Sequence, residues 1–309
     1  MTSPAASDAL IHYAAVYTSA EDYIGAVLPF LYDGLTVGDP VLVMAPTHNI
    51  DLLKARLDRS ANRVTFLDTA GELRNPARLI STSHRLAKSQ PGRRIRVVGE
   101  AIWPGRTAAE IREGVRHEAC VNILSAERAV TVFCPYDARL DAPVIEDGGR
   151  NHPHRLEGGD YRTNPKYVDP AVTLSMRDPL PAAPAHAERM DFRRADLKAV
   201  RHVVRDRASR AGISEERVSD LLLAVYEVAT NSLAHTGGPG ILRIWRDPEA
   251  LLCEIFDNGH ITDPLVGRVQ PLGHAESGRG LWMVNQLCDL VEVRSAVAGT
   301  TIRMHTALN

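Results

Sequence analysis

A chain of 309 residues with a net charge of -2 and 44% hydrophobic residues is long enough for about two domains, each with its own core. The nearly neutral charge gives no reason to expect nucleic acid or an anionic membrane as a partner. No apolar run approaches the roughly 20 residues that span a bilayer. Four scattered cysteines, without a CxxC pair or a secretory signal, are typical of reduced buried thiols. We therefore expect a cytoplasmic protein.

The N-terminal part alternates short apolar runs with helical patterns. This alternation indicates an α/β domain in which a parallel sheet of the RecA-like or Rossmann-like kind is covered on both faces. Strands are expected at Val41–Met44, Arg63–Leu67, Ile95–Val98 and Ala129–Cys134. Helices are expected at Glu21–Leu35, Ile50–Arg59, Pro76–Ser89 and Ala108–Ser125.

Candidates for a site in this part stand where the strands end, because ligands of parallel sheets lie at the carboxyl ends of the strands. A P-loop would place GxxxxGK[ST] after a strand, but the run VMAPTHNID has neither glycine nor lysine, so we expect no ATP site here. Carboxylates are seldom needed for packing, and Glu100 and Asp137 are therefore the candidate sensory residues. The spacing of five histidines fits no tight zinc motif and predicts no metal site: His12, His48, His84, His152 and His154.

The composition changes in the middle of the chain. From Glu157 onward it contains Gly158-Gly159, several Xaa-Pro pairs and the run PAAPA, which are typical of a loop-like connection. We expect a sensory domain over residues 1–156, a linker over 157–187 and a second domain over 188–309.

The second domain contains a helix that carries polar residues in a functional pattern. Residues Glu215–His235 have the apolar periodicity of an amphipathic helix, which Ser214 can cap and Gly237-Gly238 can end. Glu227 and Asn231, four residues apart, lie on one polar stripe of it. A carboxylate in this place can accept a proton from a nucleophile, and an amide oxygen one turn later can bind Mg2+.

A hairpin and a glycine-rich turn follow. Ile241–Trp245 and Leu251–Phe256 are expected to pair as strands, so that Asp257 stands at a strand end. Its carboxylate can accept a hydrogen bond from the exocyclic amine of adenine, and Gly259 leaves room for the purine. Gly278-Arg279-Gly280 precedes the helical run Leu281–Leu290, where free N–H groups and the helix dipole favour phosphate. The order of these three motifs, within about sixty residues, is typical of an ATP site.

Residues 189–308 resemble the GHKL ATPases, whose Bergerat fold is an α+β sandwich, and within them the anti-sigma-factor serine/threonine kinases. The carrying motifs are EVATN, FDNG and SGRGLWMV, which match the N, G1 and G2 boxes, and AGTTIRM, which matches the closing Gly-Thr. The resemblance implies that Glu227 is the catalytic base and that Asn231 holds Mg2+. It implies that the ATP-binding residues are Asn231, Asp257, Gly259, Gly278, Arg279, Gly280, Leu281 and Thr300.

Two features of the G1 and G2 region modify this resemblance. The family often has a second glycine in DxGxG, and here that position is Ile261. The span from His260 to Ser277 corresponds to the ATP lid, in which Arg268 is a cation that could reach a phosphate.

The N-terminal part resembles the DcmR-type sensory domain known as MEDS. The runs that carry the resemblance cover residues 10–156 and are IHYAAVY, PFLYDGLTVGDPVLV, RNPARL, VVGEAIWPGR, CPYD and NHPHR. This resemblance implies that the domain senses a small organic, hydrocarbon-derived compound.

Together the resemblances imply a regulator in which the sensory domain controls a Mg-ATP-dependent kinase. Its expected substrate is a serine or threonine of an anti-anti-sigma (STAS) protein, its second partner is a sigma factor, and a homodimer would form near Arg189–Phe192. Two alternatives stay open. A histidine-kinase-like output domain would need a phospho-accepting histidine, commonly followed by an acidic residue, whereas His202 is followed by Val203-Val204. A binding module would use ATP only as a structural ligand.

Overall fold

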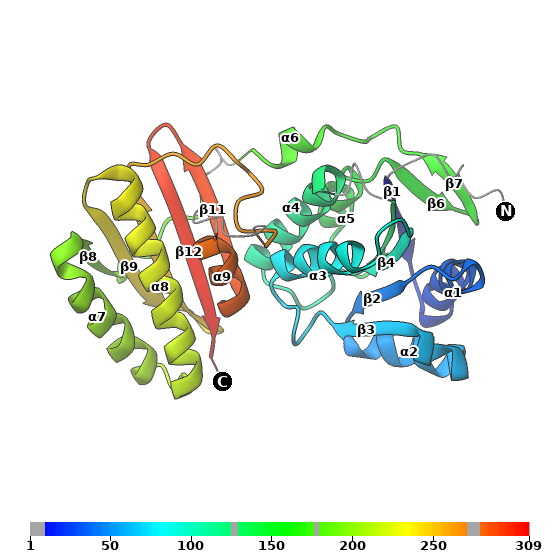
Figure 1. The fold of residues 1–309 in the computed structure, drawn as a ribbon, viewed down its shortest axis with the longest axis horizontal. Helices are drawn as coiled ribbons and strands as arrows, with labels where there is room; N and C mark the ends of the chain where they lie inside the picture. The colour runs from blue at the N-terminus through cyan, green and yellow to red at the C-terminus, as the bar shows by residue number, and fades with distance from the viewer. Residues whose placement is uncertain (1–9, 125–128, 176–178, 271–278, 309) are drawn as a thin grey trace. The chain divides into compact units, whose positions relative to one another are not determined.

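The computed structural model describes residues 10–124, 129–175, 179–270 and 279–308. The chain divides into two compact units, Met1–Leu174 and Ser175–Asn309 (Figure 1). Within the described part of the chain, no helix is both long enough and apolar enough to cross a membrane. The four cysteines are buried thiols outside any disulfide, as the sequence predicts.

The first unit contains a seven-stranded sheet with the order β3-β2-β4-β5-β1-β6-β7. All neighbouring strands are parallel except β6 and β7. The strands are β1 (Leu10–Tyr17), β2 (Val41–Ala45), β3 (Val64–Asp68), β4 (Ile95–Gly99), β5 (Val130–Asp137), β6 (His154–Glu157) and β7 (Asp160–Thr163). The mostly parallel sheet confirms the predicted class of this unit.

Helices cover both faces of this sheet. They are α1 (Ala20–Val37), α2 (Thr47–Leu57), α3 (Pro76–Ser89), α4 (Ala108–Leu124), α5 (Ala142–Gly149) and α6 (Pro170–Thr173), with a 3-10 turn at Asp58–Arg63. Successive strand residues point to opposite faces. Tyr13 on β1 therefore packs with Phe30 of α1 and stacks on Phe133 at a centroid distance of 4.8 Å, whereas its neighbour His12 bonds to Asn122 on α4.

Two parts of the first unit differ from the sequence-based expectation. The strand expected first, at Val41–Met44, is the second strand, because β1 precedes it and lies between β5 and β6. The predicted linker, residues 157–187, contains regular secondary structure in its first half. It contains β7 and α6, and Leu174 after α6 is buried with 2% of its surface exposed.

The second unit is an antiparallel sheet with helices on one face. The strand order is β11-β12-β10-β9-β8. Its strands are β8 (Glu188–Phe192), β9 (Gly240–Arg246), β10 (Ala250–Asp257), β11 (Leu290–Ala296) and β12 (Gly299–Ala307). Its helices are α7 (Leu197–Arg210), α8 (Glu215–Thr236) and α9 (Arg279–Leu287), preceded by a 3-10 turn at Arg194–Asp196. Figure 1 shows α7, α8 and α9 beside the sheet, and their apolar side chains form one core with it. The α+β prediction is therefore confirmed.

Local signals set the ends of the elements that carry the predicted ATP motifs. The Ser214 hydroxyl accepts a hydrogen bond from Arg217 N at 3.4 Å, and Gly237 ends α8 in the left-handed conformation with φ 64°. Asp247 Oδ1 accepts bonds from two backbone N–H groups in the turn between β9 and β10. The helix expected over Leu281–Leu290 ends earlier, at Leu287, because Leu290 begins β11.

The other face of this sheet is partly covered by the predicted linker. Ala183 and Ala187 pack against Trp245, Ala250 and Leu252. The Arg303 guanidinium donates to the Pro181 carbonyl at 2.7 Å and pairs with Glu254 at 2.5 Å. The proline-rich segment is thus part of the second unit's packing.

Candidate functional site

Helix α8 carries Glu227 and Asn231 at the edge of its buried stripe. Val225, Val228 and Ala229 are almost completely buried in the core, which fixes the rotation of the helix. Glu227 and Asn231 are each half-buried, one turn apart. The sheet and the helix core therefore hold a carboxylate and an amide together at a partly solvated surface, where both can meet a ligand.

The start of α9 lies against these two side chains. A Cβ atom added to Gly280 would come 2.8 Å from Asn231 Nδ2 and 3.0 Å from Glu227 Oε2. Any larger residue would displace the two polar groups, so the glycine allows the helix start to approach them closely. Arg279 is exposed, and Leu281 is buried in the core. Gly278 lies outside the described residues.

Asp257 ends β10 in a constrained turn. The residue is 8% exposed, and its Oδ1 accepts a hydrogen bond from Gly259 N at 2.7 Å. Thr300 is directly opposite Asp257 on β12 and donates its hydroxyl proton to the Gly259 carbonyl at 2.9 Å. Asp257, Gly259 and Thr300 therefore form one hydrogen-bonded group, and their contact with adenine stays a prediction.

Ile261 stands in this turn where the family often has the second glycine of DxGxG. Its N–H donates to Ser295 Oγ at 2.8 Å, and its side chain packs against the core of the unit. Among the described residues, Asp58 is the only one other than glycine with a positive φ. Ile261 thus occupies ordinary backbone space, and glycine is not required at this position.

The described part of the predicted lid is 260–270, and the remainder of it, 271–277, lies outside the described residues. Gly267 has φ +74°, and its carbonyl accepts a hydrogen bond from Asn285 Nδ2 on α9 at 3.1 Å. Arg268, the cation considered for phosphate contact, is 8% exposed. The lid's first half is therefore attached to α9.

In the first unit, the structure places Glu100 in a buried polar group rather than an open site. Its two carboxylate oxygens accept hydrogen bonds from Asn49 Nδ2 at 3.1 and 2.9 Å. Tyr23 donates to Oε1 at 2.7 Å, and Tyr17 donates to Oε2 at 3.5 Å. Burial raises the pKa of the Glu100 carboxyl to about 8, because removal from water disfavours the charged form.

Asp137, the second sensory candidate, is held by a neighbour in sequence. The Arg139 guanidinium donates to both carboxylate oxygens, with a shortest distance of 2.5 Å. This bonding lowers the pKa of Asp137. Both carboxylates therefore have local hydrogen-bonding partners, and their role in ligand binding stays a prediction.

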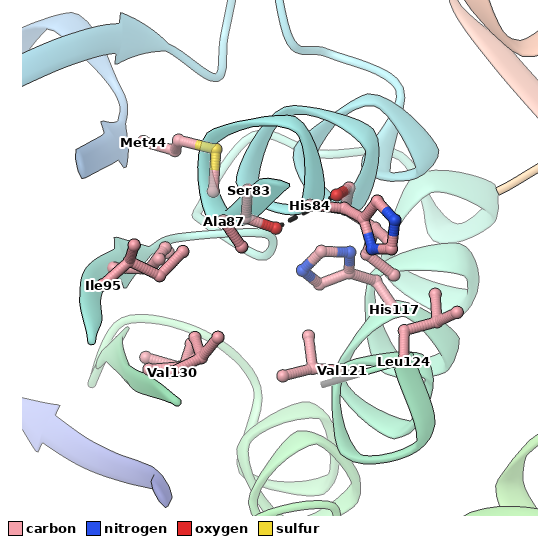
Figure 2. Close-up of a pocket in the computed structure, with 14 residues that line it drawn as sticks. Met44, Ser83, His84, Ala87, Ile95, His117, Val121, Leu124 and Val130 are labelled. Carbon is pink, nitrogen blue, oxygen red and sulfur yellow. Dashed lines mark hydrogen bonds between the residues drawn. The ribbon is translucent and has the colours of Figure 1, made fainter. Parts of the chain in front are cut away.

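An apolar cavity lies between the sheet and the helices α3 and α4 (Figure 2). Its cavity volume is about 20 Å³, and one water molecule needs about 10–15 Å³ by a comparable measure. The lining is mostly aliphatic, with two imidazoles and one thiol: Met44, Ile80, Ser83, His84, Ala87, Ile95, Val97, Gly99, His117, Val121, Leu124, Val130, Val132 and Cys134. The cavity suits a molecule of few heavy atoms. No local sequence signal points to this cavity, because its lining comes from five separate elements.

The structure also brings together two of the five histidines whose sequence spacing fits no tight zinc motif. His12 and His152 lie with ring centroids 4.1 Å apart, although 139 residues separate them in the chain. Spacing rules detect ligands that are close in sequence, so they could not reveal this pair.

The two units match two different family models. Residues 11–153 match MEDS, described as the methanogen/methylotroph DcmR sensory domain. Residues 190–306 match the histidine kinase-like ATPase domain. The chain thus contains a MEDS domain followed by a GHKL-like ATPase domain, which implies ATP binding. No curated protein matches the chain.

Several solved structures are similar to parts of the chain. The SiaB–SiaC complex from Pseudomonas aeruginosa has 13% identity and a TM-score of 0.32, and the match covers 38% of this chain and 88% of that chain. The RsbU and RsbW domains of a Mycobacterium tuberculosis protein have 16% identity and a TM-score of 0.30, with 68% of this chain and 51% of that chain covered. The ATPase domain of G40P has 13% identity and a TM-score of 0.32, with 48% and 68% covered.

Proposed function

We propose that the second unit binds Mg-ATP and transfers the γ-phosphoryl group to a serine or threonine of an anti-anti-sigma (STAS) protein, under control of the first unit. In this proposal the second partner is a sigma factor, which the protein either retains or releases. The observation that carries it is the close approach of Gly280 to Glu227 and Asn231, in a unit whose residues 190–306 match the histidine kinase-like ATPase domain.

The residues present fit the nucleotide and its metal ion. Only glycine at position 280 lets the start of α9 approach Glu227 and Asn231 this closely, and a helix start carries free backbone N–H groups that suit phosphate. The amide oxygen of Asn231 is the kind of hard donor that Mg2+ prefers, and when bound the ion would offset phosphate charge. The Asp257 carboxylate, already fixed by Gly259 N–H, would accept the adenine amine.

The chemical step needs one proton acceptor. The partner's hydroxyl oxygen attacks the γ-phosphorus, the bond between that phosphorus and the β–γ bridging oxygen breaks, and ADP leaves. The hydroxyl proton passes to the Glu227 carboxylate and then to water. The half-buried position of Glu227 beside Gly280 supports this role.

A histidine-kinase-like output domain has less support. His202, the histidine considered as acceptor from the sequence, lies on α7, and this helix buries Val200, Val204 and Ala208 in the core of its own unit. A helix packed in this way has its apolar face already occupied. The non-catalytic binding module differs from the proposal only in chemistry, so the experiment must follow phosphate.

The test combines full-length protein, ATP labelled at the γ-phosphate, and STAS proteins encoded by the same genome. We expect the labelled phosphate on a serine or threonine of one STAS protein. This label should be stable to acid and should be lost in the Glu227→Ala variant. Label on a histidine of this chain would favour the histidine-kinase alternative. Stoichiometric ATP-dependent complex formation without any label would favour the binding module.

A further inference from the structure

Four potential metal ligands converge in the interior of the first unit. His12 comes from β1, Glu118 from α4, Cys134 from β5 and His152 from the turn after α5, and their ligand atoms all lie within 4.8 Å of one another. Each of these residues is at most 2% exposed. His12 pairs with Val132 in the register of β1 and β5, so Cys134, two residues on, points to the same face.

The hydrogen bonds around the cluster fix how both imidazoles face it. His152 Nδ1 lies 3.0 Å from the Gly148 carbonyl, which can only accept, so this nitrogen carries the proton. The Asn122 amide donates to the Asn151 carbonyl at 2.6 Å, which directs its Oδ1 towards His12 Nδ1 at 3.0 Å. His12 Nδ1 is therefore also a donor. In each neutral ring the other nitrogen, Nε2, then presents a lone pair to the cluster.

These nitrogen lone pairs lie close to a carboxylate oxygen, which is also a hydrogen-bond acceptor. His12 Nε2 and His152 Nε2 each lie 3.4 Å from Glu118 Oε2. Among the residues that the structure describes, His152 Nε2 has no hydrogen-bond partner. The Cys134 thiol, 3.3 Å from Glu118 Oε2 and 3.4 Å from His12 Nε2, can offer one proton to one of them. A cation at the centre would satisfy all four groups at once, whereas buried acceptors facing each other are costly.

The distances have the scale of a tetrahedral site. Bonds of 2.0–2.3 Å from Zn2+ to nitrogen, oxygen and sulfur place neighbouring ligand atoms about 3.3–3.7 Å apart. Four of the six separations, those of Glu118 from Cys134 and from both imidazoles and that of Cys134 from His12, are 3.3–3.4 Å and agree with this value, and all six lie within 4.8 Å. A thiolate and a carboxylate would also neutralise a divalent ion, which lowers the free-energy cost of burying the complete site.

We propose that His12, Glu118, Cys134 and His152 bind a borderline-soft divalent metal ion such as Zn2+ inside the first unit. The mixed nitrogen, sulfur and oxygen donor set excludes Mg2+ and Ca2+, which take oxygen ligands. The outer bonds from His12 to Asn122 and from His152 to Gly148 orient the ligands, as second partners do in metal sites. Cys134 also lines the apolar cavity, so a bound ion would fix the position of one residue of the cavity lining.

The first experiment uses the unaltered full-length protein. Metal analysis after purification without chelators is expected to show about one zinc-like ion per chain. After chelator treatment, addition of Co2+ without nucleotide is expected to give the thiolate-to-cobalt absorption band and the intense visible bands of a tetrahedral site. Cobalt on Asn231 would give no thiolate band. The bound ion should also raise the midpoint of thermal unfolding, because it binds only the folded unit.

Matched variants assign the band to this cluster. Cys134→Ser is expected to abolish it, while Cys120→Ser, which alters another buried thiol of the same unit, should retain it. His152→Ala should weaken Co2+ binding by about 10-fold or more, while His154→Ala should not. If Cys134→Ser does not fold, the comparison of His152→Ala with His154→Ala still assigns the thiolate band to this cluster.

Two outcomes would overturn the proposal. A folded protein that binds none of Zn2+, Co2+, Fe2+ and Cu+ stoichiometrically would show that the cluster is only a buried hydrogen-bonded network. Equal cobalt spectra of the Cys134→Ser and Cys120→Ser variants would place the ion elsewhere.

Discussion

Asp257 and Thr300 face each other across strands β10 and β12. The Thr300 hydroxyl donates to the Gly259 carbonyl at 2.9 Å, and Asp257 Oδ1 accepts from the Gly259 N–H at 2.7 Å. The turn after Asp257 is thus held at both its carbonyl and its N–H group. A carboxylate fixed in this way loses little freedom when a ligand binds, so its removal should be felt mainly as lost affinity.

The Asp257→Asn variant is expected to bind ATP more weakly by about 1–3 kcal/mol, because an amide replaces a charge-assisted acceptor. GTP, which lacks the adenine amine, should bind poorly to the unaltered protein. Isothermal titration calorimetry measures both, with Asp191→Asn as a control on an exposed carboxylate of the same unit. Equal affinities for ATP and GTP would contradict the adenine assignment.

The Glu227→Ala variant should separate binding from chemistry. Nucleotide affinity should stay within about threefold, while phosphoryl transfer should fall on the order of 100-fold or more, as expected for loss of a general base. Glu216→Ala removes an exposed carboxylate from the same helix and should change neither. Transfer at the full rate by Glu227→Ala would show that this residue is not the base.

The Gly280→Ala variant should impair the site but not the fold. Its added methyl group meets the ends of two side chains, Glu227 and Asn231, which can move aside. ATP affinity is expected to fall by about 10-fold or more with a change in unfolding free energy below about 1 kcal/mol.

Gly299→Ala provides the contrast in the same unit. Gly299 has φ +135°, and a Cβ there would lie 2.2 Å from the Asp257 carbonyl oxygen, so backbone must shift. This variant should lose on the order of 1–3 kcal/mol of unfolding free energy. Thermal unfolding and calorimetry of both variants check the pair. Unchanged ATP binding by folded Gly280→Ala would remove this glycine from the site.

Glu100 should make stability depend on pH. Its pKa is 4.5 as a reference and about 8 when folded, so between these values the folded state holds a proton that the unfolded state has released. The stabilising contribution of protonated Glu100 is therefore fully present below about pH 4.5 and is lost as the pH rises through 8. Between these two values the free energy of unfolding falls by about 1.4 kcal/mol per pH unit.

The Glu100→Gln variant tests this slope, because it keeps the shape of the protonated group without titrating. Chemical unfolding of both proteins from pH 5.5 to 9 should show the unaltered chain losing stability relative to the variant up to about pH 8. A difference that is constant across this range would mean that Glu100 is charged in the folded unit at neutral pH.

The apolar cavity should admit small apolar molecules. Xenon is a suitable probe, and its binding should be visible by xenon NMR with the full-length protein. Val121→Phe, which fills the cavity from α4, should abolish the signal. Ile123→Phe changes a residue of the same helix that is 41% exposed and should leave it intact. Equal signals from the two variants would place xenon elsewhere.

Local sequence signals determined much of the second unit. The periodicity of Glu215–His235 and its flanking Ser214 and Gly237 specified α8 to within one residue. Because Glu227 and Asn231 lie on one helix, their spacing alone placed them on one stripe. The turn residues around Asp247 likewise specified the hairpin that carries Asp257. These features depend on contacts between residues near in sequence.

The first unit shows what local signals leave open. The central place of β1 depends on pairing with β5, more than a hundred residues later, and nothing within the segment IHYAAVY distinguishes a central strand from an edge strand. The cluster of His12, Glu118, Cys134 and His152 follows from that pairing. The sequence supplied the ligand types, but only the tertiary structure brought them together, because a register between distant strands is set by the packing of the whole core.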